Sequence, residues 1–203
     1  MARACVSKDK ILATAKELFY RVGYDTTSVD DILKQCKVAK SNFYYHFPTK
    51  EDLALSVLEL RVQEYETVVL QSLKNEALAP TERLEQFFAR FCKTHIEEEG
   101  SAGCPFGNFA AALPTLKTDE SCERFRRQLS KLFFEMESSI RHCITAGVQT
   151  GEFQPNVLPA ECATLMVAVL QGLLMLTKTH KDPRILKDSL IAVQKLLQPH
   201  ANS

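Results

Sequence analysis

The segment Val38–Leu53, VAKSNFYYHFPTKEDL, combines aromatic rings, hydrogen-bonding side chains and lysines in a short stretch of chain. Lysine binds phosphate, asparagine forms paired hydrogen bonds with adenine, and tyrosine donates to phosphate while its ring contacts the thymine methyl group. These residue types together favour contact with DNA. The residues here that we expect to make this contact are Lys40, Ser41, Asn42, Tyr44, Tyr45, His46 and Lys50. For His46, a role as a cap against the following helix stays open.

Two short helices are expected to position these side chains. Thr27 followed by Asp30 resembles a capping box, which predicts the start of a first helix. A tight turn then leads into a second helix that starts at Lys40 and ends before Pro48. Two such helices joined by about three residues make a candidate helix-turn-helix. We expect the hydroxyls and amides of Thr27 and Ser28, at the start of the first helix, to add phosphate contacts.

The second helix is predicted to have two different faces. Phe43 and Phe47 are four residues apart and therefore share one face. We expect their rings to anchor the helix, so that the polar residues between them are presented to a partner. The alternative is an aromatic-rich core helix whose polar face is only solvated.

The rest of the chain is also helical in pattern, because apolar residues recur at spacings of three and four without strand-like alternation. We predict an all-α fold of about nine helices. Residues 1–48 are predicted to form a three-helix domain, with a first helix from Ser7 to Gly23, and residues 49–203 a second helical domain. Within the second domain, residues 49–74 form a connecting helix, and a later helix is expected to end at Gly147.

Composition limits the class of protein. The chain has 203 residues, of which 45% are hydrophobic and 25% charged, as in soluble globular proteins. Its formal net charge is zero, but residues 1–50 hold nine Lys and Arg against five Asp and Glu, which favours a polyanionic partner at this end. The apolar run Leu165–Leu176 is shorter than a membrane span, and the N-terminus lacks a signal-peptide pattern. We therefore expect a cytoplasmic protein with no membrane partner.

The cysteines and known catalytic motifs give no sign of an enzyme. The seven cysteines are scattered without a CxxC pair, which indicates reduced thiols and predicts no metal site. The sequence has no GxSxG, HExxH or P-loop motif, and we expect no catalysis and no cofactor. Two alternatives stay open: a helical interaction protein with a decayed DNA-binding motif, and a thiol-dependent enzyme that uses Cys104.

The run ILATAKELFYRVGYDTTSVDDILKQCKVAKSNFYYHFPTKEDLALSVLE resembles the DNA-binding segment of the TetR family of bacterial transcriptional repressors. Further on, AGVQTGEFQPNVLPAECATLMVAVLQGLLML is similar to the approach to that family's last two helices. Three features depart from the family pattern: Lys37 replaces a frequent Gly, Ala39 replaces the usual Ser or Thr cap, and Ser41–Asn42 replaces a frequent Gly–Thr pair. A left-handed Lys37 is expected to cost about 1 kcal/mol relative to glycine.

The resemblance implies a dimer that binds a palindromic DNA operator through two recognition helices about one DNA turn apart. It also implies that a small apolar or reactive inducer binds the C-terminal domain, shifts the connecting helix and releases the DNA. The pocket residues that it suggests are Phe88, Phe91, Cys92, Cys104, Phe106, Phe109, Phe133, Met136, Glu137, Met166 and Leu170. For each of these residues ordinary core packing is the alternative, and for Cys104 the alternatives are a sensor thiol or a small residue in a tight turn.

The last two helices are predicted to form the dimer interface. Residues 159–178 form a helix that is apolar on nearly every face, and such a helix needs partners on every side. We expect it and the final helix, residues 183–198, to pair with their copies in a second subunit. The interface residues that we predict are Leu165, Val169, Leu173, Leu176, Leu186, Leu190, Val193 and Leu197.

Overall fold

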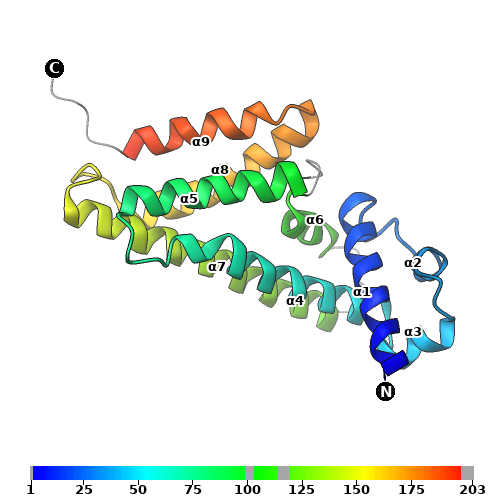
Figure 1. The fold of residues 1–203 in the computed structure, drawn as a ribbon. Coiled ribbons are helices and arrows are strands. Elements are labelled where there is room, and N and C mark those ends of the chain that lie inside the picture. Colours follow the sequence, from blue (N-terminus) through cyan, green and yellow to red (C-terminus); the bar gives the residue numbers. More distant parts are fainter. Residues whose placement is uncertain (1, 99–102, 114–118, 198–203) are drawn as a thin grey trace. The chain divides into compact units, whose positions relative to one another are not determined.

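The computed structural model describes residues 2–98, 103–113 and 119–197 (Figure 1). The described residues form nine α-helices and no strand, which confirms the predicted all-α fold. A 3-10 turn, Leu70–Ser72, follows α4, and a π-helical turn, Lys93–Glu98, continues α5. The helices are α1 (Ala2–Arg21), α2 (Val29–Cys36), α3 (Lys40–His46), α4 (Lys50–Val68), α5 (Pro80–Cys92), α6 (Pro105–Ala112), α7 (Asp119–Thr150), α8 (Pro159–His180) and α9 (Arg184–Leu197).

The chain divides into two compact units. The first comprises the described residues up to Val62 together with those of Pro105–Ser130, and the second comprises those of Gln63–Cys104 and from Lys131 onward. The first unit therefore contains α6 and the start of α7 in addition to the residues 1–48 that we predicted as one domain. Helices α4 and α7 each contribute residues to both units.

In the first unit, α1, α2 and α3 pack together around a small apolar core (Figure 1). Ile11, Ala15 and Phe19 face this core from α1, and Ile32 faces it from α2, each less than 4% exposed. Helix α1 begins before Ser7, which is therefore not the predicted N-cap but a buried residue inside the helix. Its end agrees better with the prediction, since α1 stops at Arg21 and Gly23 has a φ of +108°.

Helix α6 and the start of α7 join the first unit through an aromatic cluster. The Phe109 ring of α6 lies 6.2 Å from the Phe19 ring, 6.5 Å from the Tyr24 ring and 5.8 Å from the Phe125 ring, measured between centroids. Arg124 of α7 also forms a 3.2 Å ion pair with Asp52 of α4. Helix α6 and the start of α7 thus contact the end of α1 and the residues after it, although about a hundred positions separate them in the sequence.

The second unit is built around α5, α7, α8 and α9. Seven residues of α8 are buried on one side of that helix, and α9 packs along both α5 and α8 (Figure 1). Helix α8 has 22 residues and is apolar enough, by length and composition alone, to cross a membrane. The core helix of a soluble protein has the same properties, and the buried side of α8 packs within its own unit.

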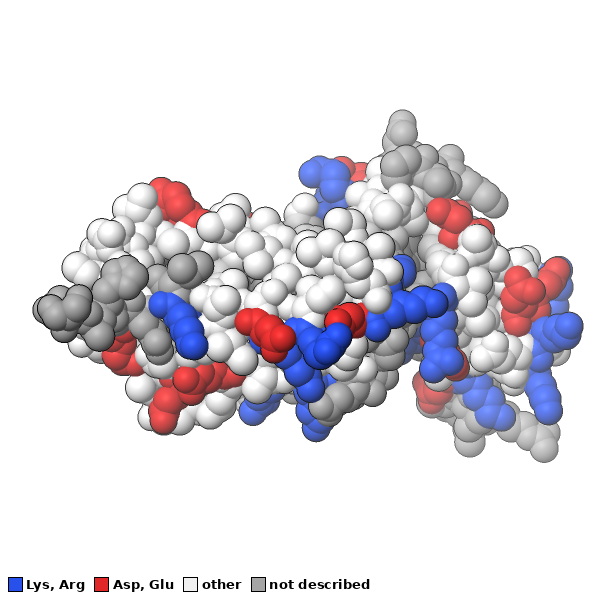
Figure 2. Space-filling model, turned by 90° about the horizontal axis from the view of Figure 1, so that it is seen from above, with Lys and Arg blue, Asp and Glu red and all other residues white. Residues whose placement is uncertain are grey.

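Basic and acidic side chains are interspersed over the face seen in Figure 2, with broad uncharged areas between them. This distribution agrees with the formal net charge of zero. Attraction to a polyanion must therefore come from the local placement of a few cations and helix N-termini, because the molecule has no net positive charge.

Candidate nucleic-acid interface

Two buried rings hold α3 against the first unit. Phe43 is 0% exposed and Phe47 is 2% exposed, and their centroids are 6.0 Å apart. The sequence pattern predicted this arrangement, because the two residues share one face of the helix. The helix has seven residues and no side-chain cap at Ala39, so the two rings are its main attachment. Anchoring leaves the opposite face of α3 open to a partner.

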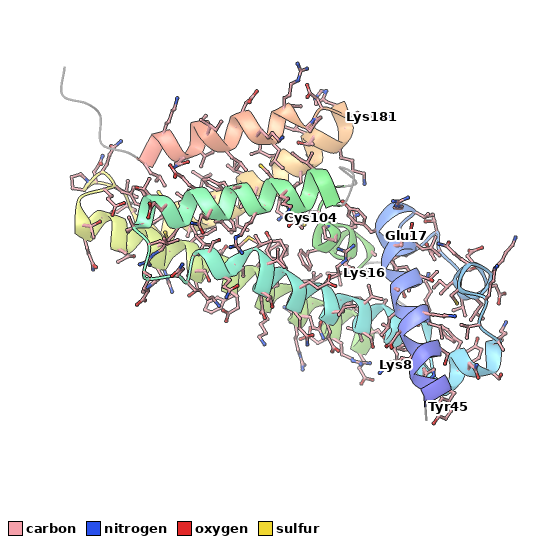
Figure 3. The ribbon with its side chains drawn as sticks, in the orientation of Figure 1. Lys8, Lys16, Glu17, Tyr45, Cys104 and Lys181 are labelled. Carbon is pink, nitrogen blue, oxygen red and sulfur yellow. The ribbon has the colours of Figure 1, made fainter. Side chains whose placement is uncertain are left out.

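The open face of α3 carries the polar residues predicted from the sequence. Lys40, Ser41 and Asn42, in the first turn, are all exposed. Tyr44 is 51% exposed and Tyr45 is 78% exposed, and Tyr45 projects from the helix into open space (Figure 3). This face of α3 therefore presents one cation, one hydroxyl, one amide and two phenols. Groups of these kinds form hydrogen bonds with DNA phosphates and base edges.

Lys40 is not a free cation in this structure. Its ammonium lies 3.2 Å from Oδ1 of Asp30 on α2, and both side chains are largely exposed. The hydrogen bond from Lys40 to Asp30 raises the pKa of Lys40 further above its usual range. Asp30 was not among the predicted site residues. It lies ten positions before Lys40 in a different helix, and no local sequence pattern predicts such a contact.

Replacing Asp30 by asparagine is expected to strengthen DNA binding about three- to tenfold at low salt. The change removes a carboxylate that repels phosphate and competes with it for the Lys40 ammonium. Both the affinity and its salt dependence should therefore rise, the latter by less than the slope of about 0.9 that a whole phosphate contact adds in each subunit. A mobility shift at several salt concentrations measures both effects. Asp188→Asn, at an exposed position of α9, is the control for a change of net charge. Equal affinity of the Asp30 variant and the wild type would remove Asp30 from the site.

A second part of the interface is a cleft between two helix N-termini. Its volume is about 690 Å³, and its lining includes Ser28 at the start of α2, Thr49 at the start of α4, and Tyr44. Thr49 Oγ1 accepts a hydrogen bond from the amide of Asp52 at 3.1 Å, so α4 begins with a side-chain cap. Helix N-termini carry partial positive charge and unpaired amides, which bind phosphate.

The capping box of α2 lies one residue later than predicted. Ser28, not Thr27, is the N-cap: its Oγ accepts from the Asp31 amide at 3.1 Å, and the Asp31 carboxylate accepts from the Ser28 amide at 2.9 Å. The Ser28 hydroxyl also donates to the Asp31 carboxylate at 2.6 Å, and this bond, together with that from the Ser28 amide, lowers the pKa of Asp31. Thr27 is 2% exposed and donates its hydroxyl to the carbonyl of Gly23 at 2.7 Å. The phosphate contact that we predicted for the Thr27 hydroxyl is therefore wrong for this arrangement.

Lys50 and His46 also have partners inside the first unit. Lys50 Nζ donates to the carbonyl of Tyr24 at 2.5 Å and lies 4.1 Å from the centre of that ring. His46 Nε2 lies 3.1 Å from Oγ of Ser7, so His46 contacts α1. The predicted cap against the following helix stays a prediction. Lys50 also lines the cleft described above, and its ammonium has three N–H donors, so the bond to Tyr24 leaves donors for a phosphate.

The turn between α2 and α3 departs from ideal geometry where the sequence indicated. Lys37 adopts the left-handed conformation, with φ 55° and ψ 41°. Side chains with a Cβ atom disfavour this conformation, whereas glycine adopts it freely. Ala39 then starts α3 without a side-chain hydrogen bond. Both departures weaken the motif slightly and leave its geometry intact.

Lys37→Gly is expected to raise the free energy of unfolding by up to about 1 kcal/mol, because the left-handed residue loses its Cβ strain. The same substitution at Lys34, inside α2, should lower that free energy by about 1 kcal/mol, since glycine is a poor helix former. Urea denaturation of both variants measures the difference. A destabilised Lys37→Gly variant would mean that the Lys37 side chain contributes more than its backbone strain removes.

The predicted pocket residues are divided between the two units. Phe106 and Phe109 belong to the first unit, and the other nine belong to the second. In the second unit Phe91, Met136, Met166 and Leu170 are at most 4% exposed, and Cys104 is 8% exposed. Phe133 and Glu137 are half-buried. Phe88 and Cys92 line an open groove between α5 and α9. Core packing accounts for most of these positions, and their part in a pocket stays a prediction.

The predicted dimer residues also separate into two groups. Leu165 and Leu176 of α8 are 63% and 42% exposed, and Val169 and Val193 are half-buried. In contrast, four leucines pack within the core of their own chain and have almost no surface left for a partner. These are Leu173, Leu186, Leu190 and Leu197, at 9%, 0%, 3% and 6% exposed. The prediction must be corrected for these four. Met175 of α8 and Ile191 of α9, which the sequence did not single out, are large apolar residues that are 64% and 55% exposed.

The fold and the site define a helix-turn-helix DNA-binding regulator. Comparison with known proteins agrees: the model of bacterial regulatory proteins of the tetR family matches residues 11–57, and that of the tetracyclin repressor-like C-terminal domain matches residues 80–193. The chain belongs to the TetR family of transcriptional regulators.

Relatives and solved structures cover nearly the whole chain. An HTH-type transcriptional regulator in the lacX 3' region of Lactococcus lactis subsp. lactis is 30% identical over 90% of this chain and 89% of its own. The HTH-type transcriptional repressor DhaR of Mycobacterium sp. (strain GP1) is 27% identical over 98% of this chain and 96% of its own. A TetR-family regulator from Agrobacterium tumefaciens has a TM-score of 0.85 at 19% identity, with 97% of this chain and 100% of that chain covered.

Proposed function

We propose that this protein is a dimeric, ligand-responsive repressor that binds a palindromic operator and is released by a small molecule. The observation that carries the proposal is α3, whose polar residues from Lys40 to Tyr45 are exposed on a helix anchored by Phe43 and Phe47. Two such helices related by two-fold symmetry contact successive major grooves of a palindrome. Repression follows where the operator overlaps a promoter, and relatives such as DhaR are named as repressors. The family acts through DNA binding and not through catalysis.

The second subunit is proposed to cover the exposed side of α8. Leu165, Met175 and Leu176 leave large apolar side chains on this surface. Gly172 lies between them, and a Cβ atom added there would have nothing within 4 Å in its own chain, so another backbone has room to approach. A two-fold contact places the same patch of each copy against the other, which suits an apolar surface without charge.

The ligand is proposed to act on the DNA-binding helices through α6 and α7. Phe109 of α6 and Phe125 of α7 pack against Tyr24, which follows α1. Gln128 of α7 also donates to Glu59 of α4 at 2.7 Å. A ligand that binds the C-terminal domain more tightly in one arrangement of these helices shifts the spacing of the two α3 helices. Coupling of about 1–3 kcal/mol would weaken operator binding about 5- to 150-fold.

A mobility shift on the DNA upstream of the protein's own gene tests DNA binding. We expect sequence-specific binding that weakens steeply with salt, and in Lys40→Ala a salt slope smaller by about 2, since each dimer loses two phosphate contacts. Tyr45→Phe retains the ring and removes the hydroxyl, and so separates stacking on the thymine methyl group from phosphate contact. Binding that does not depend on salt, or its absence with every upstream fragment, would favour the helical interaction protein with a decayed motif.

A further inference from the structure

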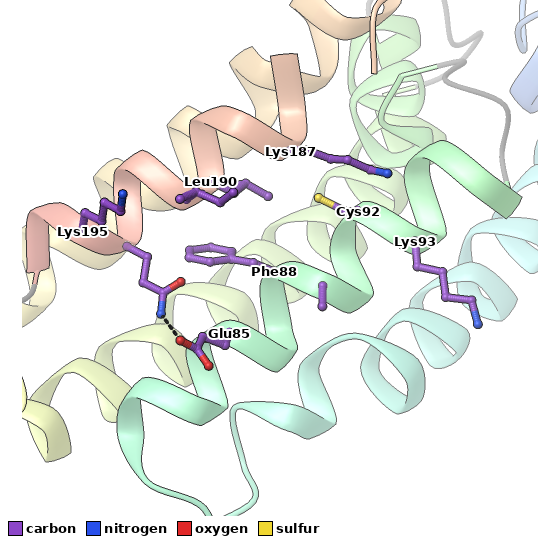
Figure 4. Close-up of a pocket in the computed structure, with 10 residues that line it drawn as sticks. Glu85, Phe88, Cys92, Lys93, Lys187, Leu190 and Lys195 are labelled. Atoms are coloured by element: carbon purple, nitrogen blue, oxygen red, sulfur yellow. Dashed lines mark hydrogen bonds between the residues drawn. The ribbon is translucent and has the colours of Figure 1, made fainter. Parts of the chain in front are cut away.

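A groove between α5 and α9 lies entirely within the second unit and has a volume of about 770 Å³ (Figure 4). Its floor is apolar, because Phe88 of α5 and Leu190 of α9 meet there, each at most 5% exposed. Ile191 extends this surface on α9, and its side chain is 55% exposed. We call this feature the α5–α9 groove. Its size falls in the range of about 300–1,000 Å³ that small-molecule sites occupy.

Charged groups lie around the apolar floor in an asymmetric arrangement. At one end of the groove, Lys187 of α9 extends towards the end of α5, beside Cys92 (Figure 4). Lys93, which follows α5, also lines this end, but its side chain extends away from α9. At the other end the Glu85 carboxylate accepts a hydrogen bond from Gln194 Nε2 at 2.9 Å, and Lys195 stands nearby. Among the described residues, no ion pair is formed by any of the three lysines. The groove therefore has an excess of positive charge beside an apolar surface.

This arrangement suits a ligand with an anionic head and an apolar body. The Lys187 ammonium at one end binds the carboxylate, and Lys93 at the same end adds positive charge, while the chain of the ligand covers Phe88 and Leu190. Lys187 and Lys195 are eight residues apart on α9, a rise of about 12 Å along the helix axis. A medium-length aliphatic carboxylate has a matching length. We propose that the α5–α9 groove binds small amphipathic carboxylates of this kind.

A second copy of the chain is a poorer occupant for the groove. A two-fold contact centred on the groove would set Lys93, Lys187 and Lys195 against the same three lysines of the partner. Like charges in close contact oppose association. The exposed side of α8 carries apolar residues without such a cluster and is the better surface for a second subunit.

Calorimetric titration of the full-length protein with decanoate tests the proposal. We expect one decanoate per chain, at least tenfold weaker binding of decan-1-ol, which lacks the charge, and no binding of decyltrimethylammonium. The double variant Lys93→Gln/Lys187→Gln should bind decanoate about tenfold more weakly, with unchanged affinity for decan-1-ol. Lys131→Gln, at an exposed lysine of α7 outside the groove, should bind as the wild type does.

A blocking variant locates the site independently of charge. Ala89 is exposed and lines the groove, so Ala89→Trp fills it with little effect on folding and should abolish binding of both decanoate and decan-1-ol. The chain has no other tryptophan, so fluorescence of the new residue reports its environment. Normal decanoate binding by Ala89→Trp or by the double lysine variant would overturn the proposal, as would the absence of binding by the wild type.

Two further measurements separate this site from the rest of the protein. A halved mass of the groove variants in light scattering would overturn the proposal by making the groove a subunit interface. Operator binding, measured by mobility shift, should be retained by every variant. Failure of the carboxylate site is therefore distinguishable from failure of the DNA-binding function proposed above.

Discussion

Phe43→Ala is expected to abolish operator binding and to lower the free energy of unfolding by about 3–5 kcal/mol, the range for removing a fully buried phenylalanine. Phe43 is 0% exposed and packs between α3 and the rest of the first unit. A helix of seven residues has little stability of its own, so α3 depends on this packing for both its position and its folding. Urea denaturation followed by circular dichroism measures the loss of stability, and a mobility shift measures the loss of binding.

The matched control is Tyr45→Ala, two residues further along the same helix. Tyr45 is 78% exposed, so its removal should change the free energy of unfolding by no more than about 0.5 kcal/mol. Its DNA affinity should nevertheless fall, because the hydroxyl and the ring belong to the proposed contact. Comparison of the two variants therefore distinguishes the loss of α3 anchoring from the loss of a DNA contact. Operator binding by a folded Phe43→Ala protein with wild-type affinity would show that the ring does not position α3.

The helix-turn-helix was predictable because its signals are local. The spacing of Phe43 and Phe47 defines one face of α3, Pro48 limits its length, and the turn at Lys37 requires a left-handed residue. Each of these features depends on neighbours within about four positions along the chain. The helix start was misplaced by one residue at Thr27 for a related reason. Two adjacent residues, each followed by an Asp three positions later, satisfy the same capping pattern, and tertiary packing chooses between them.

The less predictable features depend on contacts between distant residues. Nothing in the sequence around Lys50 indicates that its ammonium binds the carbonyl of Tyr24, 26 positions earlier. Phe109 was assigned to a ligand pocket by resemblance, whereas its ring contacts those of Phe19 and Tyr24. In the last two helices, the apolar residues pointed to two possible partners, the chain's own core and a second subunit. Periodicity alone does not separate them, and Leu186 and Leu190 lie in the core.

The same limit applies to Gly147, which was expected to end a helix. Instead α7 continues through it to Thr150, and Gly151, with a φ of +77°, follows the last turn. Glycine is retained inside α7 because the chain folds back there: the Phe153 amide donates to the Gly147 carbonyl at 3.0 Å, and a Cβ atom at Gly147 would lie 2.2 Å from Cδ2 of the Phe153 ring. The position of this glycine is therefore explained by packing and not by helix termination.

Gly147→Ala is consequently expected to destabilise the protein, although alanine is the better helix former by about 1 kcal/mol. Phe153 is 1% exposed, so its ring has no open space to move into, and overpacking of this kind costs about 1–3 kcal/mol. Urea denaturation measures the change. Gly172→Ala is the matched control, since it makes the same substitution inside α8 with nothing within 4 Å in its own chain.

The two glycine variants are expected to differ in sign. Within one chain, Gly172→Ala should add about 1 kcal/mol of stability through helix propensity. Because the proposed subunit interface includes Gly172, the same change should weaken the dimer. A loss of dimer mass in that variant would place Gly172 in the subunit interface. Combining Gly147→Ala with Phe153→Leu should destabilise less than the two single changes added together, because the smaller side chain makes room for the new methyl group. Additive effects in this double variant would mean that the Phe153 ring is not what excludes a side chain at Gly147.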